Sequence, residues 1–483
     1  MPQLPFSRDQ VFLISPSLDD WLPRDHPARF VAAWIQELTE AEWVALGIDR
    51  RPARKGEKRY APECLLAIWV YGFMTGIRSS RRLEEACRDQ IPFRWVSGNQ
   101  QPDHNTLARF YQRHRDQMRH LLRRSVQTAV QAGLVDFALQ AVDGTKIAAN
   151  AAGDRMLTAE QLALLEIRVD AAIADLEAQE TASAESGPPQ MPPELRNQHA
   201  LRERIRQANA MVAATDGPKK ANVTDPDAHL MMSKGRIVPA YNAQAVVARV
   251  PGDADHREQR LIVATEVRTR ADDHGILDTL IDQATANTGQ AAAVTVADAG
   301  YHDGAMLQTC AEREMVVVIP IPKNPAADLP YHGDRFIHDP QTNTLTCPEG
   351  KTLAHWGQTT SRSGEVVDRY GGRKGDCQPC PVKDLCAKKV KRSRVVLVPH
   401  SKPARLAHAV WMATDDAQHV RKQRGGLVEN VFGTLKTRHQ ARQWLLRGHE
   451  AVRAEWTMLA LAYNLRTLWA CSQRTRPRVA ASW

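Results

Sequence analysis

The sequence has no run of apolar residues long enough to cross a membrane, and it lacks a recognisable secretion signal. Its first residues, MPQLPFSRDQ, have neither the basic start nor the apolar stretch of a signal peptide. We therefore expect a cytoplasmic protein without a membrane partner, whose eight cysteines stay reduced instead of forming a disulfide framework. With 483 residues, 43% of them hydrophobic, the chain is long enough for two or three domains.

Positive charge is concentrated in two blocks. The net charge is +9, but residues 50–124 carry 17 Lys and Arg against 7 Asp and Glu, and residues 388–447 carry 14 against 3. Residues 154–216, between them, are acidic, with 6 basic against 11 acidic residues. Because basic surfaces attract the phosphate backbone, this distribution predicts two surfaces for DNA and an acidic one for protein.

Three acidic residues occur where an enzyme would present metal ligands. Asp143 and Asp298 end apolar runs that predict buried strands, residues 137–142 and 294–297, and Glu429 lies on an amphipathic stretch with helical spacing. Two carboxylates at strand ends and one on a helix can hold two divalent ions. Such a pair of ions indicates an enzyme that cleaves phosphodiester bonds. Taken alone, an Asp after a strand is more often a turn or helix-cap residue than a ligand, and a Glu on a helix is usually solvated. Four further acids lie in polar segments and rank below these three: Asp225, Asp227, Asp272 and Asp273.

The first basic block predicts a compact helical domain. Pro62 begins a helix that is apolar on most sides and should therefore be buried. Residues 104–124 predict one longer helix, with Arg109 and Arg113 on its outer face. A short helix, a turn and a basic helix are the outline of a helix-turn-helix reader of DNA.

The remainder predicts a mixed α/β core. Residues 238–250 and 260–269 are rich in β-forming residues and predict adjacent antiparallel strands beside the Asp143 strand. Helices over about 276–287 and 304–313 and a strand over 315–322 complete the order.

Residues 154–216 interrupt this core and predict a helical hairpin. Thr158 and Gln161 form a capping box, and apolar residues then repeat every three or four positions, as a narrow helix seam requires. The seam would pack either within this chain or against a second chain, and the sequence leaves both alternatives open.

A second insertion, residues 325–400, contains four cysteines: Cys347, Cys377, Cys380 and Cys386. The Cys-x-x-Cys pair with two further thiols could complete a tetrahedral zinc site, although only one such pair is present. His338 or His355 could replace one ligand, and an iron–sulfur cluster or simple packing of reduced thiols are the alternatives.

Eight stretches spread along the chain, in this order, resemble a bacterial insertion-sequence transposase of the DDE type, in the IS-eleven-eighty-two group. They are LLAIWVYGFMTGIRSSRRLEEACRDQIPFRWVSGNQQPDHNTLARF, AVDGTKIAANA, NVTDPDAHLMMSKG, VPAYNAQAVV, VADAGYHDG, DCQPCPVKDLC, VENVFGTLKTRHQARQWLLRG and LALAYNLRTL. The resemblance implies that Asp143, Asp298 and Glu429 are the triad of an RNase H-like domain holding two Mg²⁺ or Mn²⁺ ions. It also implies binding to terminal inverted repeats and target DNA, with a homodimer in the assembled complex.

Basic residues surround the glutamate. Related transposases often place a Tyr and an Arg before the Glu and a Lys seven residues after it; here Lys436 fits, but Lys422 and Gly425 occupy the other two positions. Nearby cations that could contact DNA are Arg421, Lys422, Arg424, Lys436 and Arg442.

These observations predict an α/β protein in which a helical DNA-binding domain, residues 1–136, precedes an RNase H-like catalytic domain, residues 137–471, and a tail, residues 472–483. We expect a DDE transposase that cleaves and transfers DNA strands. The alternatives are a nuclease of the same fold without strand transfer, and a DNA-binding repressor that no longer cuts.

Overall fold

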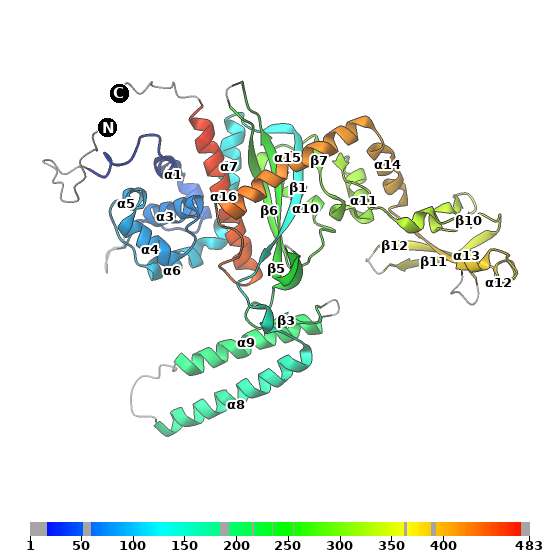
Figure 1. The fold of residues 1–483 in the computed structure, drawn as a ribbon, viewed down its shortest axis with the longest axis horizontal. Coiled ribbons are helices and arrows are strands. Elements are labelled where there is room, and N and C mark those ends of the chain that lie inside the picture. The colour runs from blue at the N-terminus through cyan, green and yellow to red at the C-terminus, as the bar shows by residue number, and fades with distance from the viewer. Residues whose placement is uncertain are drawn as a thin grey trace, which may run out of the picture.

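A helical region precedes a mixed sheet, and two insertions project from the sheet (Figure 1). This order confirms the expected mixed α/β class with an N-terminal helical region. The computed structural model describes residues 17–51, 59–183, 193–214, 217–233, 235–254, 256–361, 365–387 and 393–474. The first ten residues, which were compared with a signal peptide, and most of the predicted tail lie outside these ranges. No described helix is long and apolar enough to span a bilayer.

Short helices make up the helical region: α1 (Pro27–Gln36), α2 (Glu40–Ala45), α3 (Pro62–Thr75), α4 (Ser80–Asp89), α5 (Ile91–Val96), α6 (His104–His114) and α7 (Arg119–Gln131). Pro62 begins α3 as predicted, and the middle of this helix is buried on all sides. The single helix expected over residues 104–124 is wrong, because the 3-10 turn η1 (Arg115–Gln117) separates α6 from α7. Met118 is fully buried at this break, so tertiary packing outweighs the continuous helical pattern.

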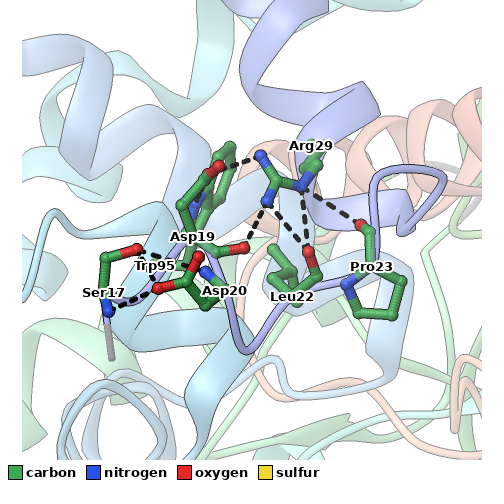
Figure 2. A network of polar contacts seen from close by, with 7 residues as sticks. All are labelled: Ser17, Asp19, Asp20, Leu22, Pro23, Arg29 and Trp95. Atoms are coloured by element: carbon green, nitrogen blue, oxygen red, sulfur yellow. Dashed lines mark hydrogen bonds and ion pairs between the residues drawn. The ribbon is translucent and has the colours of Figure 1, made fainter. Parts of the chain in front are cut away.

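The first described residues are fastened to the helical region by Arg29 of α1 (Figure 2). Its guanidinium lies 2.6 Å from the Asp19 carboxylate and donates to the Leu22 carbonyl at 2.8 Å. The Trp95 indole N–H donates to the same carboxylate at 3.0 Å, and the guanidinium lies 4.8 Å from the Trp95 ring centre. The loop before α1 is therefore held against α5.

The central sheet contains β1 (Asp136–Ala148), β4 (His229–Ser233), β5 (Arg236–Val250), β6 (Gln259–Arg268), β7 (Val294–Val296) and β8 (Val317–Val318). The order is β4-β5-β1-β7-β8, and β6 also pairs with β5. As predicted, β5 runs antiparallel to both β1 and β6, whereas β7 and β8 are parallel to β1. The strand expected over 315–322 is shorter, because Pro320 and Pro322 cannot donate to a ladder.

Helices cover the sheet: α10 (Leu277–Thr288), α11 (Gly304–Glu312), α14 (Lys402–Met412), α15 (Asp415–Thr437) and α16 (His449–Ser472). α15 crosses over the sheet and contacts β1, β5, β7 and β8 (Figure 1). α16 lies between the sheet and the helical region and contacts β6, α3 and α7. The buried core is consequently continuous from the helical region into the sheet.

The hairpin insertion extends away from the sheet (Figure 1). It comprises η2 (Gly153–Arg155), β2 (Met156–Leu157), α8 (Ala159–Ser183), α9 (Pro193–Ala213) and β3 (Ala221–Asn222). The predicted capping box is present, since the Thr158 amide donates to Gln161 Oε1 at 3.0 Å. α8 and α9 pack against each other within the chain, around Leu162, Val169 and Ile205.

The cysteine-containing insertion is a small antiparallel sheet with short helices. Its elements are η4 (Pro325–Asp328), η5 (Gly333–Arg335), β9 (Ile337–Asp339), β10 (Thr344–Thr346), β11 (Thr352–Thr360), β12 (Val366–Gly372), α12 (Lys374–Cys377), α13 (Lys383–Ala387) and β13 (Val395–Pro399). The strand order is β13-β12-β11-β10-β9, so every strand pairs with its neighbour in sequence. Phe336, Leu345 and Tyr370 are in its separate core.

Candidate active site

Parallel pairing of β1 and β7 brings Asp143 and Asp298 to the same edge of the sheet. Ala141 pairs with Val296, and each aspartate lies two residues further along the chain. Neighbouring strands are about 4.8 Å apart, so the two carboxylates are neighbours. Burial raises the pKa of Asp143 and the Asp298 charge adds to this, while Arg424 opposes both. Two negative charges therefore meet where a divalent cation would reduce their repulsion.

Asp143 lies inside β1, and not at the end of a strand as the sequence predicted. β1 continues because β5 pairs with it as far as the Ala148–Ala240 pair. Asp298, in contrast, directly follows β7 and caps the 3-10 turn η3 (Ala299–Tyr301), where its carboxylate accepts a backbone N–H at 2.8 Å. β1 therefore continues beyond Asp143, and the strand residues that follow this aspartate also border the candidate site.

The helix α15 is fastened over this edge by two cations. Arg424 Nη1 lies 3.0 Å from Asp143 Oδ2, and Lys436 Nζ donates to the Thr145 hydroxyl, two residues further along β1. Glu429 lies between these cations, and Lys436 follows it by two turns on the same side of the helix. The side of α15 that bears Glu429 therefore faces the strand of Asp143.

The Glu429 carboxylate itself is exposed and folds back along its helix. Its Oε1 lies 3.2 Å from the point where a side chain on Gly425 would begin. In the described part of the chain, no three His, Cys, Asp or Glu side chains are arranged to hold a metal ion. The donor set nevertheless fits Mg²⁺ or Mn²⁺, which prefer carboxylate oxygens. An ion bound by Asp143 would have to compete with Arg424 for this carboxylate.

One of the four acids ranked lower lies beside this site. Asp273 is 9% exposed, accepts from the Asn242 and Gln244 amides at 2.7 Å each, and approaches Asp298 at Gly300. The sequence carried only an indirect signal for it, because two amide residues, Asn242 and Gln244, interrupt the apolar run that became β5. The other three acids act elsewhere: Asp225 accepts the Tyr241 hydroxyl, Asp227 accepts the His449 amide, and Asp272 pairs with Arg270.

Most of the cations predicted to contact DNA are on the surface. The exposed ones are Arg109 and Arg113 on α6, Arg421 and Lys422 on α15, and Arg442 after α15. Arg424 and Lys436 instead contact β1. Trp444, which lies between Arg442 and Arg447 in the sequence, is 1% exposed and belongs to the core.

The four cysteines of the second insertion converge on one cavity of about 40 Å³: Cys347, Cys377, Cys380 and Cys386. Burial raises the pKa of Cys386, and the charges of the other three thiols act in the same direction. His338 and His355 do not line this cavity; they contact the Tyr370 hydroxyl at 3.1 Å and Asp368 at 2.9 Å, respectively. None of the four thiols is in a disulfide, and four thiolates are a donor set that suits zinc, but among the described residues they are not grouped closely enough to hold an ion.

Two family models match separate parts of the chain. Residues 346–469 match a transposase DDE domain, and residues 16–113 match a transposase domain, DUF772. Among curated proteins, nothing matches the chain. The first match includes Glu429 and the four cysteines, and the second covers the helical region up to Arg113. Such transposases bind DNA and generally use divalent metal ions. Neither match includes Asp143 or Asp298, whose roles depend on the geometry of the sheet.

Proposed function

We propose that this chain, a transposase with a DDE domain, mobilises an insertion sequence of the IS-eleven-eighty-two group. It binds the terminal inverted repeats of the element, cleaves a DNA strand and transfers the freed 3′ end to target DNA. The observation that carries the proposal is the meeting of Asp143 and Asp298 on parallel strands beneath the helix of Glu429. This arrangement supports an RNase H-like catalytic domain over residues 137–471, preceded by a DNA-binding domain.

Asp143, Asp298 and Glu429 would hold two Mg²⁺ or Mn²⁺ ions. Such ions, when bound, activate water and stabilise the leaving oxygen in an in-line displacement. Arg424 places positive charge at Asp143, and Lys436 places it at Thr145, two residues further along β1, where both can orient a phosphate. The reaction needs no covalent intermediate, so it requires no nucleophilic Ser, Tyr or Cys.

DNA is proposed to contact both basic surfaces. The exposed arginines of α6, Arg109 and Arg113, suit this helix to a groove. A cavity of about 250 Å³ between the helical region and the sheet extends the positive charge; its cations include Arg115, Arg119, Arg123 and Arg453. Arg421, Lys422 and Arg442 would hold phosphates near Glu429 without sequence preference. Two copies would assemble on the two element ends, in the bacterial cytoplasm beside the nucleoid.

The cysteine insertion is proposed to hold one structural zinc ion. Convergence of Cys347, Cys377, Cys380 and Cys386 on one small cavity supports this, since a tetrahedral site needs four such donors. The ion would stabilise the insertion and take no part in cleavage.

Substitution of the three acids tests the catalytic proposal. Asp143→Asn, Asp298→Asn and Glu429→Gln keep the side-chain shape but remove a charge that the ions require. We expect each to lower metal-dependent cleavage of inverted-repeat DNA by at least about 100-fold while gel-shift affinity stays near wild type. Asp154→Asn, an exposed acid outside the site, is the control. Wild-type cleavage by any of the three variants would remove that residue from the triad.

The same substrates separate the alternative functions. A wild-type protein that cuts the repeat ends and joins them to a second duplex is a transposase. Cleavage without joining would indicate a nuclease of the same fold, and specific binding without cleavage a repressor. Replacing Arg109 and Arg113 by alanine should weaken binding to repeat ends more than to scrambled DNA at matched salt. Equal weakening on both duplexes would contradict sequence recognition by α6.

A further inference from the structure

We propose that Asp273 is a positioning residue of the proposed catalytic site, where it holds the turn that follows Asp298 against β5. The inference rests on the proposed function, because it gives Asp273 a task in the site of Asp143 and Asp298. Asp273 belongs to the loop between β6 and α10, and its buried carboxylate reaches residues of β5 and η3.

The carboxylate of Asp273 orients two buried amide side chains. Asn242 Nδ2 and Gln244 Nε2 both donate to Asp273 Oδ1 at 2.7 Å. The NH₂ groups of both amides therefore face the same carboxylate oxygen, and each amide directs its own oxygen away from it. The carbonyl oxygen of Gln244 is thereby turned toward Tyr301, whose hydroxyl donates to it. Asp273 thus selects the amide orientation that ties the turn after Asp298 to β5.

Gly300 is the point at which the two carboxylates approach each other. A Cβ on Gly300 would lie 3.0 Å from Asp273 Oδ2 and 3.0 Å from Asp298 Oδ1, so these oxygens are separated by no more than twice that distance. Asp298 Oδ1 also accepts the Gly300 N–H at 2.8 Å. Contacts of this kind around a metal-binding carboxylate fix its orientation and tune its affinity for the ion.

The same amides restrict the residue that follows Asp143. Gly144 pairs with Gln244 across the strands, and a Cβ on Gly144 would collide with the Gln244 amide nitrogen. Asn242 Oδ1 is buried without a hydrogen-bond partner and lies 2.9 Å from the same point. Successive strand residues face opposite sides, so this amide pair lies behind the strand from the Asp143 side chain. Asp273 therefore acts from the face of the sheet opposite to the Asp143 side chain, and from there it positions Asp143 and Asp298.

Two substitutions of Asp273 separate its hydrogen bonds from its charge. Asp273→Ala removes the acceptor and frees both amides to turn, whereas Asp273→Asn can direct its oxygen toward them and loses only the charge. Amide hydrogen exchange of residues 298–304, measured without metal or DNA, should speed up at least about tenfold in Asp273→Ala. The Mn²⁺ concentration for half-maximal cleavage should rise about 10- to 100-fold. Asp273→Asn should stay close to wild type in both measurements.

Asp272→Ala is the matched control, because Asp272 is adjacent in sequence but pairs with Arg270 and does not contact the amides. Wild-type exchange and metal dependence in Asp273→Ala would overturn the proposal, and so would exchange that speeds up throughout the sheet. Asp273→Asn that is as defective as Asp273→Ala would also overturn it, since the charge itself would then be required. If the wild-type protein cuts no DNA, the proposed function fails, and hydrogen exchange still decides the role of Asp273.

Discussion

The helical region and the sheet share one core, whereas each insertion has a small core of its own. The shared core includes Leu66 of α3, Val246 of β5 and Trp456 of α16. The hairpin and the cysteine insertion pack around separate, much smaller groups of residues. Because contiguous packing units open cooperatively, a change in the shared core should affect both the helical region and the part of the sheet that bears Asp143 and Asp298. A change in an insertion should stay local.

Buried polar contacts fasten the two parts of the shared core together. Arg78, in the turn after α3, pairs with Glu455 of α16, and both side chains are at most 5% exposed. Arg78 also donates to the Gln440 carbonyl at 2.6 Å, and His439 lies 3.0 Å from the Phe73 carbonyl oxygen. Gln440 and His439 follow α15 directly, so the helical region is bonded to the segment that leaves α15.

The largest loss of structure is expected when zinc ligands are removed from the cysteine insertion, and it should stay confined to that insertion. Purified protein should carry about one zinc per chain, and Cys377→Ser with Cys380→Ser should lose it and unfold the insertion, because a small core depends on such an ion. Elemental analysis and limited proteolysis measure both results. Cys64→Ser, in the helical region, is the control and should retain the zinc. Absence of zinc and iron from the wild-type protein would leave packed thiols as the explanation.

A smaller loss of stability is expected at the buried pair of Arg78 and Glu455, and it should extend to both parts of the shared core. Arg78→Met leaves the Glu455 carboxylate buried without its cation and should lower the free energy of unfolding by about 3–5 kcal/mol. Denaturant unfolding followed by tryptophan fluorescence should show the helical region and the sheet losing stability together. Arg50→Met, which breaks a more exposed pair with Glu63, should lower the stability far less, because water screens an exposed ion pair. Loss of the helical region alone would show that the two parts do not share a cooperative unit.

Much of the fold could be predicted because its signals are local. Proline at the start of α3, the capping box of α8 and the β-rich runs of β5 and β6 each depend on a few adjacent residues. The break between α6 and α7 has no such signal, because neither glycine nor proline marks it and the apolar spacing continues through it. It arises from packing of Met118, which the local sequence does not encode.

The residues of the candidate site likewise divide into those that the local sequence predicts and those that depend on long-range contacts. Asp143 and Asp298 follow apolar runs and could be found from them, and parallel pairing then brings them together. Asp273 lies in a polar stretch that resembles a surface loop, and its partners Asn242 and Gln244 are about thirty residues away on another strand. The contact between Arg424 and Asp143 likewise joins residues far apart in the chain. Such contacts follow from the fold as a whole.

The smallest effect concerns the pH dependence of stability and arises from His439, which contacts α3 at the Phe73 carbonyl. This side chain is fully buried, and burial lowers its pKa to about 4, with Arg466, Arg438 and Arg78 acting in the same direction. The folded protein therefore keeps His439 neutral at a pH where the unfolded chain, with a pKa near 6.5, already binds a proton. Stability is unaffected above pH 6.5 and falls as the pH drops toward 4, by up to about 3 kcal/mol from this residue.

His439→Gln removes this titration while it keeps an amide donor for the Phe73 carbonyl. Its free energy of unfolding should therefore decline less steeply than that of the wild type between pH 6.5 and 4. Other buried histidines, such as His408, titrate in both proteins, so the difference between the two pH profiles isolates His439. Because His439 joins α3 to the segment after α15, the difference should appear in the unfolding of the shared core and leave the proteolysis of either insertion unchanged. If the free energy of unfolding declined equally with pH in the wild type and in His439→Gln, the folded protein would not hold this histidine neutral.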